Sequence, residues 1–184
     1  MSEQKIKYQK VLDFWFTETQ PKQWFAKSEK FDKEIYTRFY EEHKRARHGE
    51  LVKWRDSIEG CLAEIILLDQ FSRNMYRNQP RSFAYDGMAL VLAQEAVKRE
   101  DVKTLNQKQR AFLYMPFMHS ESLVIHESAL NYFNEAGLEK HLKQEKKHRA
   151  ILVKFGRYPH RNEVLGRKTT QEEAAFLKQP RSSF

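Results

Sequence analysis

The sequence predicts an all-α fold in a single domain, residues 1–184, made of helix pairs that pack against each other. Apolar residues recur at helical spacing through most of the chain, and no segment shows the alternation of a half-buried strand. The connections are short, and hydrophobic residues make up 40% of the 184-residue chain. A chain of this length and composition can bury one continuous core. No fixed repeat length is visible, so periodicity alone does not indicate a solenoid.

Two amphipathic helices open the chain. The first covers residues 6–16, and Pro21 prevents its continuation because proline lacks the amide hydrogen that a helix interior needs. Ser28 is placed to cap the second helix, whose apolar face lies within residues 31–43. Gly49 follows the end of that helix, where glycine is favoured.

The middle of the chain continues the helical pattern. Ser57 precedes a strongly apolar helix over residues 58–71. Residues 72–83 break the periodicity and are expected to form a long connection. A further helix is expected over residues 86–98.

A capping box formed by Asn106 and Gln109 opens the next helix, over residues 107–117. Pro116 is expected to end or kink this helix, because its ring and its missing N–H disturb the helical hydrogen bonds.

The remaining helices lie in the last third of the chain. Residues 121–133 and 138–155 form two of them, and Gly156 is placed as a C-terminal cap. A doubled capping box over residues 169–173 opens a last short helix that ends near Lys178.

Charge and cysteine content narrow the function classes. The net charge is +8, and residues 140–184 carry the whole excess. Part of it lies in residues 139–149, which have the composition of a solvated helix face.

The single cysteine, Cys61, excludes an intrachain disulfide and a metal cluster built from the cysteines of one chain. Because no run of membrane length and no apolar leader are present, we expect a cytoplasmic protein without a membrane partner. No motif points to a cofactor or a metal.

Three segments place polar residues beside apolar ones. In the first, "LLDQFSRN", Asp69 and Arg73 are spaced i, i+4 and can pair on one helix face. In the functional interpretation, Arg73, Asn74 and Arg77 point their donors into a cleft, and Asp69 orients Arg73. The alternative is an ion pair at a helix end, with Asn74 as a left-handed cap.

The second segment is "LYMPFMHSES". His119 follows Pro116, and Ser120 can cap the helix that follows. A histidine with a pKa near 6.5 is a candidate acid or base at such a junction. The alternative is a buried histidine with Glu121 as its partner.

The third segment is "FGRYPHRNEVLGR", residues 155–167, in which two glycines and a proline restrict the backbone. Its donors suit a phosphate or carboxylate, because arginine presents a planar fork. They are Arg157, His160, Arg161, Asn162 and Arg167. The alternative is that they tie the C-terminal tail to the domain.

We expect the three segments to converge on one site. The first hypothesis is a binding site for a small phosphorylated or carboxylated ligand, or for an acidic peptide terminus. The second is an enzyme of the hydrolase type, with His119 or His160 as general base and the arginines stabilising negative charge. A histidine–carboxylate hydrogen bond and a water-excluding pocket would favour the enzyme. Nucleic-acid binding through the basic C-terminal quarter ranks last, because no stacking motif accompanies the charge. The candidate residues are Asp69, Arg73, Asn74, Arg77, His119, Glu121, Arg157, His160, Arg161, Asn162 and Arg167.

With these segments in view, the chain resembles the DUF924 family, a domain of unknown function. The resemblance rests on "VLDFWF" (11–16), "ILLDQFSRNMYR" (66–77), "FAYD" (83–86), "RAFLYMPFMHSES" (110–122) and "FGRYPHRNEVLGR" (155–167). It implies a tetratricopeptide-like right-handed superhelix and brings no established activity or catalytic residue. Ser72 stands where the family usually has proline.

Overall fold

The computed structural model describes residues 3–180 and 182, and every regular element in that part of the chain is a helix, as the sequence predicts. The first helices are α1 (Glu3–Asp13), α2 (Pro21–Trp24), α3 (Glu29–Arg47), α4 (Ile58–Ile66), α5 (Ser72–Met75) and α6 (Asp86–Ala96). The later helices are α7 (Gln107–His119), α8 (Leu123–Phe133), α9 (Glu139–Phe155) and α10 (Gln171–Leu177).

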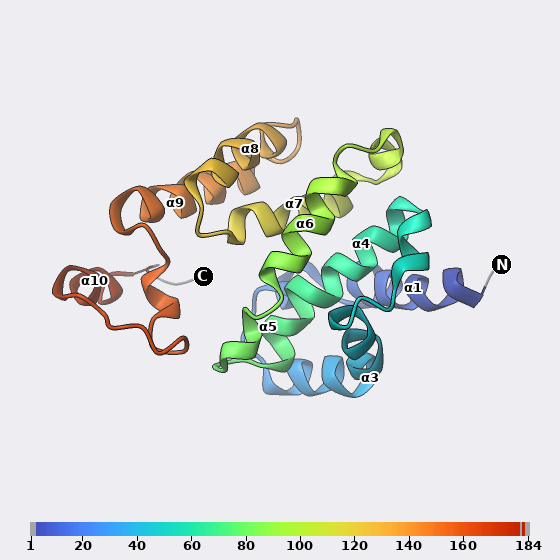
Figure 1. The fold of residues 1–184 in the computed structure, drawn as a ribbon, viewed down its shortest axis with the longest axis horizontal. Helices are drawn as coiled ribbons and strands as arrows, with labels where there is room; N and C mark the ends of the chain where they lie inside the picture. The colour runs from blue at the N-terminus through green and yellow to red at the C-terminus, as the bar shows by residue number, and fades with distance from the viewer. Residues whose placement is uncertain (1–2, 181, 183–184) are drawn as a thin grey trace.

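Neighbouring helices in the chain pack against each other. Contacts join α6 to α7, α7 to α8 and α8 to α9, while α1 and α6 both pack on α4. Figure 1 shows the N-terminal helices on one side and α8, α9 and α10 on the other, with α6 and α7 between them. This order is the one expected for packed helix pairs.

One large core fills the N-terminal side and continues under α7 and α8. Its largest fully buried side chains include Trp15, Trp54, Phe71 and Phe112. A second, small cluster around Leu152 and Tyr158 attaches the C-terminal segment to α9. Burial of these aromatic side chains stabilises the fold, because each removes a large apolar area from water. None of the described helices is long and apolar enough to cross a membrane.

Local capping signals are confirmed where they depend on neighbouring residues. Ser28 accepts from the Phe31 amide, Ser57 accepts from the Gly60 amide, and the capping box at Asn106 is complete. Gly156 ends α9 with φ of 69°, the left-handed conformation that favours glycine.

At the C-terminus one capping box forms instead of two. Thr170 and Glu173 make it, while Glu172 points to Lys154 at 3.3 Å. Only one pair of residues can stand at the N-cap and N3 positions of α10, so the doubled pattern was redundant.

The middle of the chain differs from the prediction in two places. The helix expected over residues 58–71 consists of α4 and a π-helical turn, Leu67–Phe71 (η3). This turn leads directly into α5. The long connection expected over residues 72–83 is therefore partly helical: α5 occupies its start, and a 3₁₀ turn, Pro80–Ser82 (η4), lies near its end. Tertiary packing overrode the weak local pattern, since Ser72, Asn74 and Ser82 are buried.

α7 runs through Pro116 to His119 instead of ending at the proline. Proline removes a single backbone hydrogen bond, and here the residues on both sides of it are buried, so packing holds the helix. Ser122, not Ser120, is the N-cap of α8; the Ser120 hydroxyl accepts from the Ser122 amide at 3.2 Å.

Candidate functional site

Asp69 lies in the π-helical turn η3 and is fully buried. Three side chains donate to its carboxylate. Gln70 Nε2 lies 2.5 Å from Oδ2, His119 Nδ1 lies 2.7 Å from Oδ1, and Arg73 Nη1 lies 3.0 Å from Oδ1. Burial by itself raises the pKa of Asp69, but Arg73, His119 and the hydrogen bonds outweigh it and bring the net pKa well below its ordinary value. Asp69 is therefore an anion at neutral pH.

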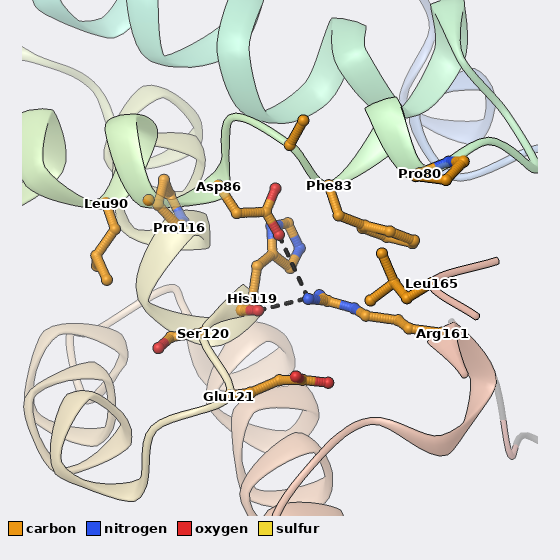
Figure 2. A pocket seen from close by; sticks show the side chains of 12 residues that line it. Pro80, Phe83, Asp86, Leu90, Pro116, His119, Ser120, Glu121, Arg161 and Leu165 are labelled. Atoms are coloured by element: carbon orange, nitrogen blue, oxygen red, sulfur yellow. Dashed lines mark hydrogen bonds and ion pairs between the residues drawn. The ribbon is translucent and has the colours of Figure 1, made fainter. Parts of the chain in front are cut away.

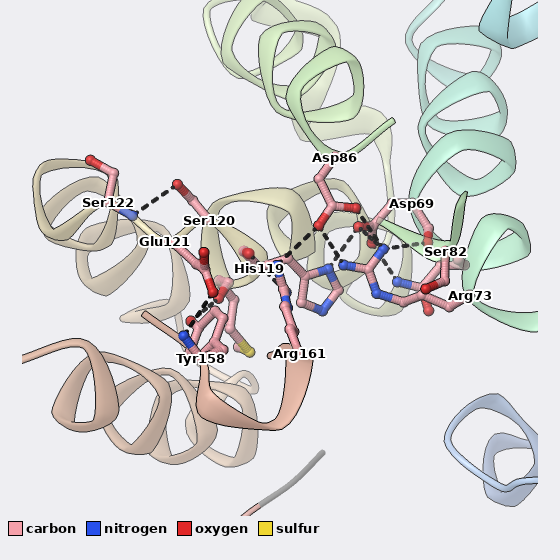
Figure 3. Close-up of polar contacts among 12 residues, drawn as sticks. Asp69, Arg73, Ser82, Asp86, His119, Ser120, Glu121, Ser122, Tyr158 and Arg161 are labelled. Atoms are coloured by element: carbon pink, nitrogen blue, oxygen red, sulfur yellow. Dashed lines mark hydrogen bonds and ion pairs between the residues drawn. The ribbon is translucent and has the colours of Figure 1, made fainter. Parts of the chain in front are cut away.

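Arg73 connects Asp69 to a second carboxylate, Asp86, at the start of α6. The guanidinium holds Asp86 through two hydrogen bonds, of 2.9 and 3.0 Å, and Nη1 also donates to the Asp69 carbonyl at 2.7 Å. Such a fork is the strongest form of arginine–carboxylate contact. The predicted i, i+4 pair of Asp69 and Arg73 is confirmed as part of a larger network (Figure 3).

His119, the last residue of α7, is held by Asp69 through Nδ1. Burial lowers the pKa of His119, and the neighbouring Arg73 lowers it further, although Asp69 raises it. Because Nδ1 faces the Asp69 carboxylate, the neutral imidazole carries its proton on Nδ1. Nε2 is then the nitrogen that remains for a ligand or a water molecule.

Arg161 enters from the other side of the site, at the end of a 3₁₀ turn, Pro159–Arg161 (η6). The residue is only 6% exposed. Nη2 donates to the His119 carbonyl at 3.0 Å, and Nη1 lies 3.4 Å from an Asp86 oxygen that Arg73 already holds. Its guanidinium also covers the rings of Phe83 and Tyr158, at 4.6 and 4.7 Å.

The Arg161 charge is thus poorly compensated. Burial lowers the pKa of Arg161, and Arg73 adds a repulsion in the same direction, which outweighs the attraction of the Asp86 and Glu121 carboxylates. Its Nε is buried and has no hydrogen-bond partner among the described residues. A buried donor left unpaired is costly, and each such group in a folded protein calls for an explanation.

A pocket of about 330 Å³ opens between α6, the end of α7 and the segment after η6 (Figure 2). This volume suits a small molecule. Its polar walls come from Asp86, His119, Ser120, Glu121 and Arg161. Its other walls are Pro80, Phe83, Ala84, Gly87, Leu90, Pro116 and Leu165.

The structure brings together one member or more of each predicted segment. Asp69 and Arg73 come from the first, His119 and Glu121 from the second, and Arg161 from the third (Figure 3). Arg167 reaches the rim indirectly, because its fork holds Glu121 at 2.7 and 3.0 Å.

Two residues of the first segment face elsewhere. Asn74 donates to Asp32 of α3 at 2.8 Å, and Arg77 holds the same carboxylate at 2.6 and 2.8 Å. Asn74 is the next residue after Arg73 in α5, so its side chain leaves the helix in a different direction, and Arg77 lies beyond the end of α5 at Met75. They join α5 to α3 and do not line the pocket.

Two residues of the third segment hold α10. Arg157 makes a fork to Glu173 at 2.7 and 2.9 Å, and Asn162 donates to the same carboxylate at 3.2 Å. This arrangement matches the tail-clamp alternative for these two residues. His160 packs against the ring of Tyr158 at 5.7 Å and is not part of the pocket lining. Burial and Arg161 lower the pKa of His160 to about 3.

Sequence reasoning missed Asp86 and Phe83, which complete the site. The sequence pattern predicts Asp86 only as the start of a helix, but Asp86 is the carboxylate that two arginines share. The string "FAYD" (83–86) belongs to the resemblance described above, and it was the available signal. No group of three or more His, Cys, Asp or Glu side chains that could hold a metal occurs in residues 3–180 and 182.

The fold and the site define an all-helical protein with a buried Asp–His–Arg network beside a small pocket of mixed polar and apolar lining. The chain belongs to the family described as "Bacterial protein of unknown function (DUF924)", whose model matches residues 11–181. It is similar in structure to a protein of unknown function from Agrobacterium tumefaciens, with a TM-score of 0.91 and 34% sequence identity over 97% of this chain and 100% of that one. Comparison with curated proteins gives no match.

Proposed function

We propose that the pocket binds a small ligand with one anionic group, a carboxylate or a phosphate, placed against Arg161. The observation that carries the proposal is the state of Arg161. Its guanidinium is almost fully buried, and its carboxylate partner is shared with Arg73 and lies 3.4 Å away. A ligand anion would give this charge a partner of its own, and a charge-assisted hydrogen bond in a buried site is strong.

The apolar walls define the rest of the ligand. Phe83 and Leu165 offer hydrophobic surface next to Arg161, and Leu90 adds to the apolar lining of the pocket (Figure 2). A ligand with a short apolar or aromatic body would bury that surface as well as its anionic group.

A thermal-shift panel tests this proposal. Benzoate and phenyl phosphate carry an apolar body and an anion; acetate and inorganic phosphate carry the anion alone. At about ten times the Kd, a ligand adds ~1.4 kcal/mol to the unfolding free energy, which raises Tm by roughly 3–6 °C in a chain of this length. We expect the aromatic anions to act at lower concentration than their small counterparts. Equal responses to all four anions, or none, would contradict the proposal.

A second function, hydrolysis, is favoured by the hydrogen bond between His119 and the buried Asp69 carboxylate. In this reaction His119 Nε2 accepts a proton as a water oxygen bonds to an acyl carbon or phosphorus of the ligand. The bond to the leaving group then breaks, and the proton passes to that group. Arg161 stabilises the negative charge that develops on the ligand oxygens.

The tautomer of His119 is the first test of this second function, because only an unprotonated Nε2 can accept the proton. Nitrogen-15 NMR of the imidazole should show the Nδ1–H form at pH 7. Release of p-nitrophenol from its acetate and phosphate esters should then be lost in His119→Gln and kept in His48→Gln, a change at an exposed histidine. An Nε2–H tautomer, or turnover that His119→Gln leaves intact, would rule out His119 as the base.

A further inference from the structure

A second polar cluster lies between α3 and the segment that joins α5 to α6. His43, Arg47 and Tyr40 come from α3, and Tyr76, Arg81 and Tyr85 come from the segment. The His43 ring packs edge-on against the rings of Tyr76 and Tyr85, each at 5.4 Å. Arg47 Nη1 donates to the Tyr85 hydroxyl at 3.3 Å, and the Arg81 guanidinium lies 5.4 Å from the Tyr76 ring centre.

The charge of this cluster is unbalanced. Every other arginine in the described part of the chain has a carboxylate oxygen within 4 Å of a guanidinium nitrogen, and Arg47 and Arg81 do not. The groups that interact electrostatically with Arg47 are the hydroxyls of Tyr85, Tyr76 and Tyr40. Two cations therefore share a site whose other polar groups are neutral.

The same cluster also holds three unpaired polar atoms. Tyr76 Oη, Arg47 Nε and His43 Nδ1 are buried and have no hydrogen-bond partner among the described residues. Tyr76 is 4% exposed and His43 is 0% exposed. A single unpaired group would be unremarkable in a domain of this size, but three in one cluster are unusual.

All three atoms can act as donors. Tyrosine and arginine present O–H and N–H groups. His43 Nε2 lies 2.8 Å from the Ser72 hydroxyl, which can donate to it, and the proton of the neutral ring then sits on Nδ1. Burial, Arg47 and Arg81 lower the pKa of His43 to about 4, so the ring is neutral at pH 7.

We infer that this cluster, the Arg47–Arg81 cluster, binds a tetrahedral oxyanion, a phosphate or sulfate group. A water molecule would satisfy unpaired donors but would leave two guanidinium charges without a counterion. A phosphate supplies several acceptor oxygens and balances both charges. Arg81 is exposed and Arg47 is half-buried, so the anion reaches the cluster from solvent.

The cluster is separate from the pocket around His119. Tyr85 contacts Arg47 and His43 of α3, whereas the next residue, Asp86, contacts Arg73 and Arg161. The inference therefore does not depend on the proposed function, and variants at each site can distinguish them.

Inorganic phosphate is the probe, titrated against sodium chloride of the same ionic strength while Tm is recorded for the full chain. The background is Arg161→Leu, which removes the charge of the pocket. In this background phosphate should raise Tm. Arg47→Gln and Arg81→Gln should each weaken the phosphate Kd about 10-fold or more, the loss expected for one charge-assisted contact. Arg45→Gln is the matched control, because it removes one charge from the same helix where Glu50 already balances it.

Tyr76→Phe gives a second, independent readout. Removing an unpaired buried hydroxyl should leave Tm without phosphate unchanged or higher, while the phosphate Kd weakens. A variant that melts at or above the wild-type temperature and binds less phosphate supports the site. The inference is overturned if phosphate does not stabilise the Arg161→Leu background, if Arg45→Gln loses as much affinity as Arg47→Gln, or if Tyr76→Phe binds phosphate as tightly as its parent.

Discussion

The Asp69 carboxylate has three side-chain partners in the pocket network. Because it is buried, its removal should lower the free energy of unfolding strongly. It is an acceptor for Gln70, Arg73 and His119, and its own side chain is fully buried. Without Asp69, Gln70 and His119 lose their acceptor and Arg73 keeps only the Asp86 carboxylate, which it shares with Arg161. Such a loss in a buried site is far more costly than the loss of a surface pair.

We therefore expect Asp69→Ala to lower the free energy of unfolding by about 3 kcal/mol or more. Asp13→Ala is the control, since Asp13 is exposed and should lose less than about 1 kcal/mol. Urea denaturation with a common m-value measures both. Equal urea midpoints for the two variants would mean that the network does not stabilise the fold.

The residues of the third segment have two different tasks. Arg157 and Asn162 hold α10 through Glu173, while Arg161 faces the pocket. The sequence showed that these donors were fixed in place by two glycines and a proline. It could not show which carboxylate each one meets, because that depends on contacts between distant elements.

At the scale of elements, Glu173 is the residue that attaches α10. Its carboxylate accepts from Arg157, Asn162 and the Thr170 amide, and the residue is 2% exposed. Few other contacts join α10 to the domain: it touches η6, and Phe176 packs on Phe155.

Glu173→Ala should therefore release α10 without unfolding the domain. We expect a local loss of about 2 kcal/mol, from three donors left without an acceptor, seen as faster hydrogen exchange in residues 171–177. Glu172→Ala, at an exposed position, should leave exchange unchanged. Loss of protection throughout α7 and α9 would show instead that α10 is part of the cooperative core.

Element prediction succeeded where the signal was local. Ser28, Ser57, Asn106 and Gly156 act as caps because capping needs only residues three or four positions away. The π-helical turn at Asp69 had no local signal, and packing of the buried residues around it determines its course. π-Helical turns occur frequently at functional sites.

At the scale of the whole molecule, the all-α class was predictable and the site was predictable only in part. Five of the eleven candidates meet in one network because the η3–α5 segment, the end of α7 and the turn η6 come together there. Asn74 and Arg77 could not be excluded beforehand, since their partner Asp32 lies more than 40 positions away in the chain. The right-handed tetratricopeptide-like superhelix stays a prediction.

The buried histidines make the fold sensitive to acid. Burial lowers the pKa of His43 to about 4, and lowers those of His148 and His160 to about 3. A histidine with a lowered pKa in the folded state binds protons more readily when unfolded. Its contribution to stability is thus complete above the unfolded pKa of about 6.5 and is lost as the pH falls below it.

At pH 5 each of these three histidines should lower the free energy of unfolding by about 2 kcal/mol, relative to pH 7. Carboxylates scarcely titrate in this window, so the unfolding free energy should fall by several kcal/mol between pH 6.5 and 5. His148→Gln should reduce that slope by about one proton. Urea denaturation at a series of pH values measures the slope; a free energy that is constant from pH 7 to 5 would show that these histidines are accessible to protons in the folded state.

The central claim is that Arg161 and the pocket beside His119 bind an anionic small molecule. Isothermal titration with benzoate, whose planar carboxylate is not the tetrahedral oxyanion inferred for the Arg47–Arg81 cluster, tests it most directly in wild type, Arg161→Leu and Arg149→Leu. Arg161→Leu should still fold, because Arg73 keeps its fork on Asp86, and Arg149 is a surface arginine of α9 away from the pocket. We predict saturable one-site binding in wild type and Arg149→Leu, and at least a 10-fold weaker Kd in Arg161→Leu. The same Kd in all three proteins, or no binding to wild type, would contradict the claim.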